Sequence, residues 1–348
     1  MYAQKKVGYL GFSNDSPNTL ENKFTWVGLN SGNLIFDHAL KKLLDAELIP
    51  IDRRNEYDAD DYKSLITTAF IWILPNDPRI VDWHKALLAY AKNKPLIPIS
   101  VGLQCHIYSK EFKIHEGTVK VLTEMAERCV LGVRGYYAAE ILNKHGIKNI
   151  SVIGCPSLYL NGNRNFTVKN CANPKNISSN FRAFHGVLKH HETEFLKYCA
   201  SNKFSFVEQN QATLTKEMCG AKDYAILTKW LSNCTHIFFS ATEWIDYYHS
   251  FNFNIGYRFH ANVAALHAAV PSLYLTPDSR VSEMCEFFKL PTIKPEAFDP
   301  KKSIDYYANL ADYSDFNANY ASAFDNFVAF CKCNDVPLHM KNSIEIFH

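Results

Sequence analysis

Residues 129–153, CVLGVRGYYAAEILNKHGIKNISVI, contain the pattern that decides the fold class. An apolar run at 129–133 is followed by helical spacing over 136–144 and by a second apolar run at 150–153. A strand, a helix and a strand in this order predict a βαβ unit with parallel strands. The same alternation continues through most of the chain, so we expect an α/β protein whose parallel sheets are covered by helices.

The length and composition predict two lobes. A chain of 348 residues exceeds one comfortable core, and its 47% hydrophobic residues can fill two. The Asn-rich stretch NGNRNFTVKNCANPKNISSN lacks apolar periodicity and is typical of a linker. We expect a Rossmann-like α/β/α lobe over 1–162, a linker over 163–180, a Rossmann-like lobe over 181–315 and a helical segment over 316–348. Two such lobes imply a cleft at the carboxyl ends of their strands.

Two apolar segments are predicted strands. AFIWIL at 69–74 is a continuous apolar run, which is typical of a strand buried on both faces. Residues 181–185 open the second lobe and are expected to form its first strand.

Charge, apolar runs and cysteines exclude several classes of protein. Lys and Arg number 37 against 35 Asp and Glu, and this balance excludes a charge-driven nucleic-acid binder. No apolar run reaches the ~20 residues of a membrane span, and no leader peptide is recognisable. We expect a cytoplasmic protein, with peripheral attachment at the inner face of the membrane left open. The ten cysteines have no CxxC pair or metal-like spacing, so we expect reduced thiols and no metal.

Three predicted strand ends carry an arginine before a helix: Arg134, Arg258 and Arg280. Free N–H groups at a helix start attract anions, and guanidinium binds phosphate or carboxylate with two parallel hydrogen bonds. His260 lies in the second junction, four residues after Gly256. Together these junctions predict a site for a small, highly charged anion. Surface ion pairs and a structural histidine are the alternative at this point.

The segment GYRFHANVAALHAAVPSLYLTPDSR at 256–280 resembles the polysaccharide pyruvyl transferase family. Members typically show Gly-x-Arg-x-His, a helix of small residues, a proline, a strand and a basic residue. Arg258 and His260 fit this pattern, and Arg280 stands where Lys or Arg is usual. Ala261 replaces the usual glycine after the histidine.

Other segments extend the resemblance over most of the chain. Residues 132–160 resemble the family's arginine-containing segment with Arg134, and they end in Gly-Cys-Pro, with Cys155 where Asp is common. NSGN at 30–33 is similar to the loop after the first strand, and SVGLQ at 100–104 to a glycine-rich strand end.

The resemblance implies a GT-B-like arrangement of the two lobes and phosphoenolpyruvate as donor. Family members move its pyruvyl group onto two hydroxyls of a sugar in a surface polysaccharide of bacterial type, or in its precursor. The product is a cyclic ketal, and phosphate leaves. The implied donor site contains Arg134, Arg258 and Arg280, with His260 as general acid and no cofactor. The acceptor sugar is free, nucleotide-linked or lipid-linked.

The implied reaction suits these residue types. An enol ether reacts only after its methylene carbon is protonated, which needs a general acid with a pKa near the working pH. A neighbouring phosphate would raise the pKa of His260 and keep it protonated. Ser279 and Gly256 flank the basic residues and are expected in the donor site.

The resemblance implies that the donor binds on the lobe at 181–315 and the acceptor on the lobe at 1–162. The acceptor side is less defined in the sequence. Asn33, Asp37 and His38 lie at the start of a helix expected to face the cleft, and we predict that they contact the substrate. Candidate bases for the acceptor hydroxyl are Asp37, His38, Glu243 and Asp246. Trp26, Tyr136 and Tyr137 are aromatic residues near junction loops that could stack on a sugar, although most aromatic residues belong to cores.

Two alternatives stay open. A GT-B glycosyltransferase with a sugar-nucleotide donor would share the fold, but such enzymes often carry two Glu seven residues apart, and Glu243 has no such partner. A non-catalytic homologue would share the fold without the chemistry.

Overall fold

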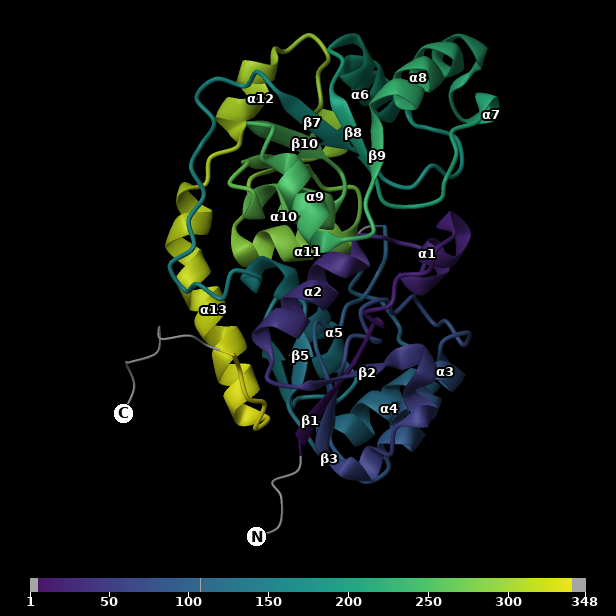
Figure 1. Ribbon diagram of the computed structural model, residues 1–348, viewed down its shortest axis with the longest axis vertical. Helices are drawn as coiled ribbons and strands as arrows, with labels where there is room; N and C mark the ends of the chain where they lie inside the picture. The colour runs from purple at the N-terminus through teal and green to yellow at the C-terminus, as the bar shows by residue number, and fades with distance from the viewer. Residues whose placement is uncertain (1–5, 107, 340–348) are drawn as a thin grey trace.

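The computed structural model describes residues 6–106 and 108–339, which form two α/β lobes stacked end to end (Figure 1). The N-lobe sheet has the order β2-β1-β3-β4, and a parallel bridge between Val101 and Val133 joins it to the pair β5-β6. All its strand pairs are parallel. The strands are β1 Lys6–Gly11, β2 Glu47–Pro50, β3 Tyr62–Thr67, β4 Leu96–Pro98, β5 Leu131–Val133 and β6 Ile150–Val152. This 2-1-3-4 order is that of flavodoxin-like doubly wound sheets.

Helices flank the N-lobe sheet and follow its strands. They are α1 Leu20–Trp26, α2 Asn33–Leu43, α3 Val81–Ala91, α4 Glu116–Ala126 and α5 Tyr136–Lys144, with short 3-10 turns at Ile51–Glu56, Ala59–Asp61 and Pro156–Tyr159. Helix α2 shows how these helices pack. Its buried residues, including Ile35, Ala39 and Leu40, recur at helical spacing, while Lys41 and Lys42 lie in its last turn, where cations suit the helix dipole.

The C-lobe sheet is also fully parallel, in the order β9-β8-β7-β10-β11-β12. Counted along the chain this is 3-2-1-4-5-6, the Rossmann order. The strands are β7 Ile177–Asn180, β8 Ser205–Glu208, β9 Thr235–Ile237, β10 Phe253–Gly256, β11 Ser272–Leu275 and β12 Thr292–Ile293. The helices are α6 His190–Ser201, α7 Lys216–Cys219, α8 Ala221–Cys234, α9 Ala241–Tyr248, α10 Phe259–His267, α11 Ser279–Phe288 and α12 Ile304–Leu310. The prediction of two Rossmann-like lobes is confirmed.

Two predicted strands are wrong in position. Residues 69–74 are a loop after β3, not a strand. Their apolar pattern arises because Phe70 and Ile73 are buried while Trp72 is exposed. The strand itself, β3, contains Ser64 and Thr67, which are buried although polar and therefore hid it from an apolar search.

The second displaced strand is the first one of the C-lobe. It is β7, at Ile177–Asn180, within the predicted linker, and 181–185 follow it as loop. Its sequence ISSN is mostly polar, yet Ser178, Ser179 and Asn180 are fully buried. The linker therefore ends before residue 177.

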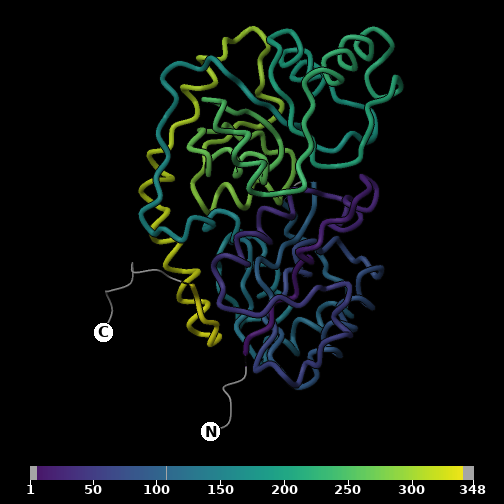
Figure 2. Tube along the Cα trace, in the orientation of Figure 1, coloured from purple at the N-terminus to yellow at the C-terminus, as the bar shows by residue number. Residues whose placement is uncertain are grey.

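The last helix, α13 Ser314–Cys333, runs along one side of both lobes (Figures 1 and 2). Its residue Asn319 donates to the carbonyl of Phe287 in α11, and Asn334, just after it, binds the backbone of Val130 in the N-lobe. The predicted C-terminal helical segment thus braces the two lobes against each other.

Two buried histidines make stability depend on pH. Burial lowers the pKa of both His84 and His267 to about 4. Between pH 6.5 and 4 the unfolded chain therefore binds protons that the folded chain does not, so the free energy of unfolding falls with falling pH, by up to about 3 kcal/mol per histidine. We expect His84→Phe, beside Phe70, to reduce this fall in urea titrations at pH 7.5 and 5. An unchanged pH dependence in the variant would contradict this assignment.

Candidate active site

A cavity of about 930 Å³ lies between the lobes and is lined by both. Its walls come from loops at the carboxyl ends of the parallel strands, including those after β1 and β3 and those after β7 and β10. Between β1 and β3, and between β7 and β10, the direction of winding reverses, and in such sheets ligands bind at these switch points.

The turn from β10 to α10 places Arg258 and His260 in the cavity. A buried amide network holds this turn. The Asn180 side chain accepts a hydrogen bond from the Arg258 N–H at 2.7 Å and donates to the Asn262 side chain at 2.7 Å. A Cβ at Gly256 would lie 2.3 Å from the Asn180 Oδ1 atom, so only glycine fits there.

Arg258 is buried and partly satisfied by the protein. Its Nε donates to the Phe181 carbonyl at 2.9 Å, its Nη2 donates to Asn210, and Glu208 lies 4.0 Å away. Burial lowers the pKa of Arg258 to about 10, which leaves it a cation at neutral pH.

Arg134 is a buried cation with little compensation. It follows β5, and its Nη2 donates to the Ile71 carbonyl at 2.6 Å. Within 6–106 and 108–339, its Nε and Nη1 atoms have no hydrogen-bond partner. A Cβ at Gly102 would lie 2.3 Å from the guanidinium carbon, so glycine makes room for it. Burial and Arg280 lower the pKa of Arg134 to about 10.

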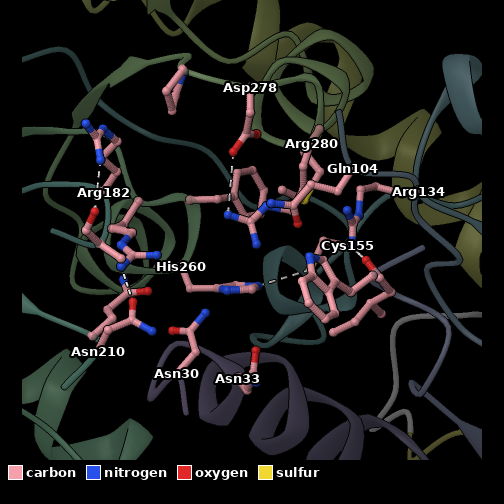
Figure 3. A pocket seen from close by; sticks show the side chains of 18 of the residues that line it. Asn30, Asn33, Gln104, Arg134, Cys155, Arg182, Asn210, His260, Asp278 and Arg280 are labelled. Carbon is pink, nitrogen blue, oxygen red and sulfur yellow. Dashed lines mark hydrogen bonds and ion pairs between the residues drawn. The ribbon is translucent and has the colours of Figure 1, made fainter. Parts of the chain in front are cut away.

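Arg280 enters the cavity from the first turn of α11. Its Nη2 lies 3.8 Å from Asp278, a long contact, and its Nε is buried with no partner among the described residues. Figure 3 shows Arg280 and Asp278 on one side of His260, with Arg134 beyond Cys155. Unpaired buried N–H groups cost free energy, and both Arg134 and Arg280 carry such groups at the cavity.

His260 lies among the three arginines. Burial, then Arg280, Arg134 and Arg258, lower its pKa to about 3, so the imidazole is neutral in the empty cavity. Its Nε2 is 3.6 Å from the sulfur of Cys155.

The lobes contact each other next to the cavity. The Ser279 N–H donates to the Cys105 carbonyl at 3.1 Å, and the Ser279 hydroxyl accepts from the Cys105 N–H at 3.1 Å. On the other side, Asn210 donates to the Leu29 carbonyl at 2.6 Å. Glu283 of α11 accepts from the first turn of α5, and burial raises the pKa of Glu283 to about 7. These contacts fix the two lobes, and so the two walls of the cavity, relative to each other.

The structure brings some predicted site residues together and not others. Arg134, Arg258, Arg280, His260 and Asn33 line the cavity. In contrast, Ser279 and Gly256 do not. Both are buried in the supporting structure, where Ser279 clamps the lobes and Gly256 admits Asn180.

Asp37 and His38 do not line the cavity, which corrects the expectation that they face the cleft. The Asp37 carboxylate accepts from the Tyr9 hydroxyl and the Phe12 N–H, and it pairs with Lys41 at 2.7 Å. These contacts fix the helix α2 against β1.

The other candidate bases and aromatic residues also lie outside the cavity lining. Glu243 and Asp246 belong to α9, and Trp26, Tyr136 and Tyr137 are likewise absent from the walls. Sequence reasoning missed the lining residues Trp72, Gln104, Asn210 and the basic group Arg182, His185, Lys189. Gln104 lies in the segment 100–104 already noted, whereas Trp72 was hidden in a predicted strand.

Over 6–106 and 108–339, no helix has the length and apolar character needed to cross a bilayer. The same ranges contain no cluster of three or more His, Cys, Asp or Glu able to hold a metal ion.

Comparison with known families bears on this site. A sequence model of the polysaccharide pyruvyl transferase family matches residues 12–279. The chain belongs to the polysaccharide pyruvyl transferase family. The matched range includes Arg134, Arg258 and His260. Arg280 lies one residue beyond its end. No curated protein matches the chain.

Solved structures similar to this pyruvyl transferase family member are distant. MnaA of Staphylococcus aureus, solved with UDP, has 13% identity and a TM-score of 0.43, covering 91% of this chain and 82% of that one. A UDP-N-acetylglucosamine 2-epimerase assigned in Listeria monocytogenes has 12% identity and a TM-score of 0.45, covering 95% and 96%. HepE of Anabaena with UDP has 10% identity and a TM-score of 0.41, covering 94% and 95%. We draw no functional inference from similarities of this size.

Cys155, at a position where the resemblance predicts Asp, lies beside His260. The Cys155 sulfur accepts from the Ser157 hydroxyl at 3.1 Å and faces His260. Burial raises the pKa of the Cys155 thiol, so the group beside the imidazole is neutral. The histidine therefore has no carboxylate here to hold its proton.

Proposed function

We propose that the protein transfers the pyruvyl group of phosphoenolpyruvate to two hydroxyls of a sugar, forming a cyclic ketal and releasing phosphate. The observation that carries this proposal is a pair of arginines around a neutral His260: the buried Arg134, whose Nε and Nη1 have no partner among the described residues, and the half-buried Arg280, whose Nε has none. Phosphoenolpyruvate is small and carries close to three negative charges. It would supply the anions that these arginines lack.

Donor binding would also raise the pKa of His260, the proposed general acid. Burial, and after it the charges of Arg280, Arg134 and Arg258, lower the pKa of His260 and suppress its protonation. A bound carboxylate and phosphate would offset their charge and raise the pKa of the imidazole. The proton would then arrive with the donor, and His260 would be charged only when there is an enol ether to protonate.

The proposed transfer begins with protonation of the donor. His260 gives its proton to the methylene carbon, which becomes a methyl group and leaves the central carbon cationic. A sugar hydroxyl adds to that carbon and loses its proton. The bond from carbon to phosphate oxygen breaks, phosphate leaves with the electron pair, and a second hydroxyl adds with loss of its proton. Of the two hydroxyl protons, one restores the protonated His260 and the other is taken up by the departing phosphate. Arg134, Arg258 and Arg280 would stabilise the departing phosphate.

Proton uptake tests this proposal. At pH 8 the donor is fully ionised and His260 is neutral, so binding should take up protons, with one proton per donor molecule as the upper limit. Isothermal titration of phosphoenolpyruvate in PIPES and in Tris should give different apparent enthalpies, and the difference should vanish in His260→Ala. His249→Ala, an exposed histidine after α9, is the matched control and should keep the difference. Binding without any buffer dependence would contradict the proposed state of His260.

A further inference from the structure

The two walls of the cavity differ in charge. The C-lobe wall contributes Arg182, Lys189, Glu192, Arg258, Asp278, Arg280 and Glu296. Among the described lining residues of the N-lobe, Arg134 is the only permanent charge. The remainder of that wall includes Leu29, Asn30, Asn33, Trp72, Ser100 and Gln104, which we call the neutral wall.

Polar groups on the neutral wall lack partners in the protein. Ser100 is 3% exposed, its hydroxyl has no hydrogen-bond partner among the described residues, and its φ is +62°. A serine rarely adopts this left-handed conformation, and such strain concentrates at functional sites. The buried Oε1 atom of Gln104 also lacks a partner in the described ranges. This oxygen needs a donor, which a sugar hydroxyl supplies and an ionised carboxylate or phosphate does not.

Apolar groups on the neutral wall are exposed to the cavity. Trp72 is 47% exposed and Leu29 is 62% exposed, and Leu29 also has a positive φ of 63°. An exposed indole offers a flat apolar face with a polar edge. Such a face suits the C–H surface of a pyranose ring, while amide and hydroxyl groups around it suit the ring's hydroxyls.

Residues of the neutral wall lie on two sides of the proposed acid. Figure 3 shows Asn30 and Asn33 on the side of His260 opposite Arg280 and Asp278, and Gln104 on the same side as Arg280. The ring of Phe36, also in the lining, lies 5.7 Å from the imidazole ring. A ring seated on the neutral wall would therefore present its hydroxyls to a donor held by the arginines.

We propose that the neutral wall is the subsite for an uncharged pyranose, so that the hydroxyl pair modified belongs to a neutral sugar and not to a uronic acid or a sugar phosphate. This inference rests on the proposed function for the role of the sugar. The chemistry of the wall identifies the ligand class by itself: amide and hydroxyl groups, an indole face and no cation besides Arg134.

Saturation-transfer NMR tests the subsite directly. The probes are the methyl glycosides of glucose, galactose and mannose, each matched by the uronic acid of the same ring, with and without phosphoenolpyruvate. At least one neutral glycoside should bind, about tenfold or more tightly than its uronate. Trp72→Ala and Gln104→Leu should each weaken that binding about tenfold or more and leave phosphoenolpyruvate affinity unchanged.

Trp83→Ala is the matched control. Trp83 is also exposed, at 38%, but belongs to α3 and stacks under Arg54 outside the cavity lining. Its loss should leave glycoside binding intact. Tighter binding of a uronate, neutral binding that survives both cavity variants, or no neutral binding up to about 100 mM would overturn the inference. Glycoside binding without any phosphoenolpyruvate binding would instead overturn the proposed donor and leave the subsite standing.

Discussion

Replacing His260 by alanine is expected to lower pyruvyl transfer by about 10²- to 10⁴-fold, the usual contribution of a positioned general acid. Cys155, the group beside the imidazole, is a poor substitute for the acid because burial raises the pKa of its thiol. Donor binding should survive, since the arginines remain. The measurement is phosphate release from phosphoenolpyruvate under saturating donor and acceptor, beside a donor affinity by titration.

The control for this prediction is His249→Ala, which removes an exposed imidazole and should change neither quantity. A loss of activity in His260→Ala that is matched by an equal loss of donor affinity would mean that the histidine binds the donor and does not protonate it. Activity within about twofold of the unmodified protein would exclude the acid role altogether.

Replacing Arg134 by methionine is expected to weaken phosphoenolpyruvate binding by about 30-fold to several thousand-fold, as removal of one partner from a buried charge pair does. The protein without ligand should lose no more than about 1 kcal/mol of unfolding free energy, because the variant removes a buried cation that has two unpaired N–H atoms, only one hydrogen bond, to Ile71, and a partial offset from Glu283. Function and stability should therefore separate at this position.

Arg258 offers the contrasting case. It faces Glu208 at 4.0 Å, and burial raises the pKa of that carboxyl. Arg258→Met should therefore lower both donor affinity and stability. The control for charge removal is Arg164→Ala, whose arginine pairs with Asp325 at the surface outside the lining. Unchanged donor affinity in Arg134→Met would show that this guanidinium does not face the anion.

Much of the fold followed from local pattern. Residues 136–144 and 272–275 form α5 and β11 as predicted, because their apolar periodicity matches the face that they bury. The strands whose positions were predicted wrongly, β3 and β7, contain polar residues that are buried. Asn180 of β7 and Ser64 of β3 are buried because long-range partners satisfy or surround them, and such partners are invisible in a window of sequence.

Some residues of the candidate site could be predicted from the sequence and others could not. Residues carried by the junction motif, such as Arg258 and His260, lie in one cavity because the carboxyl ends of parallel strands share one edge. The prediction that Asp37 faces the cleft was wrong because a sequence shows where a helix starts but not which face it buries. Its carboxylate accepts a hydrogen bond from the Tyr9 hydroxyl. Trp72 was missed because an apolar loop and a buried strand have the same composition.

The measurement that tests the central claim most directly is the melting temperature with phosphoenolpyruvate, compared with UDP and UDP-sugars, in the unmodified protein and in Arg134→Met. A ligand at 100 times its dissociation constant adds about 2.7 kcal/mol to the stability of the folded state, enough to be seen as a shift. We predict a rise with phosphoenolpyruvate that falls to about a third or less in Arg134→Met. A rise with a UDP-sugar and none with phosphoenolpyruvate would contradict the assignment of this cavity to a pyruvyl donor.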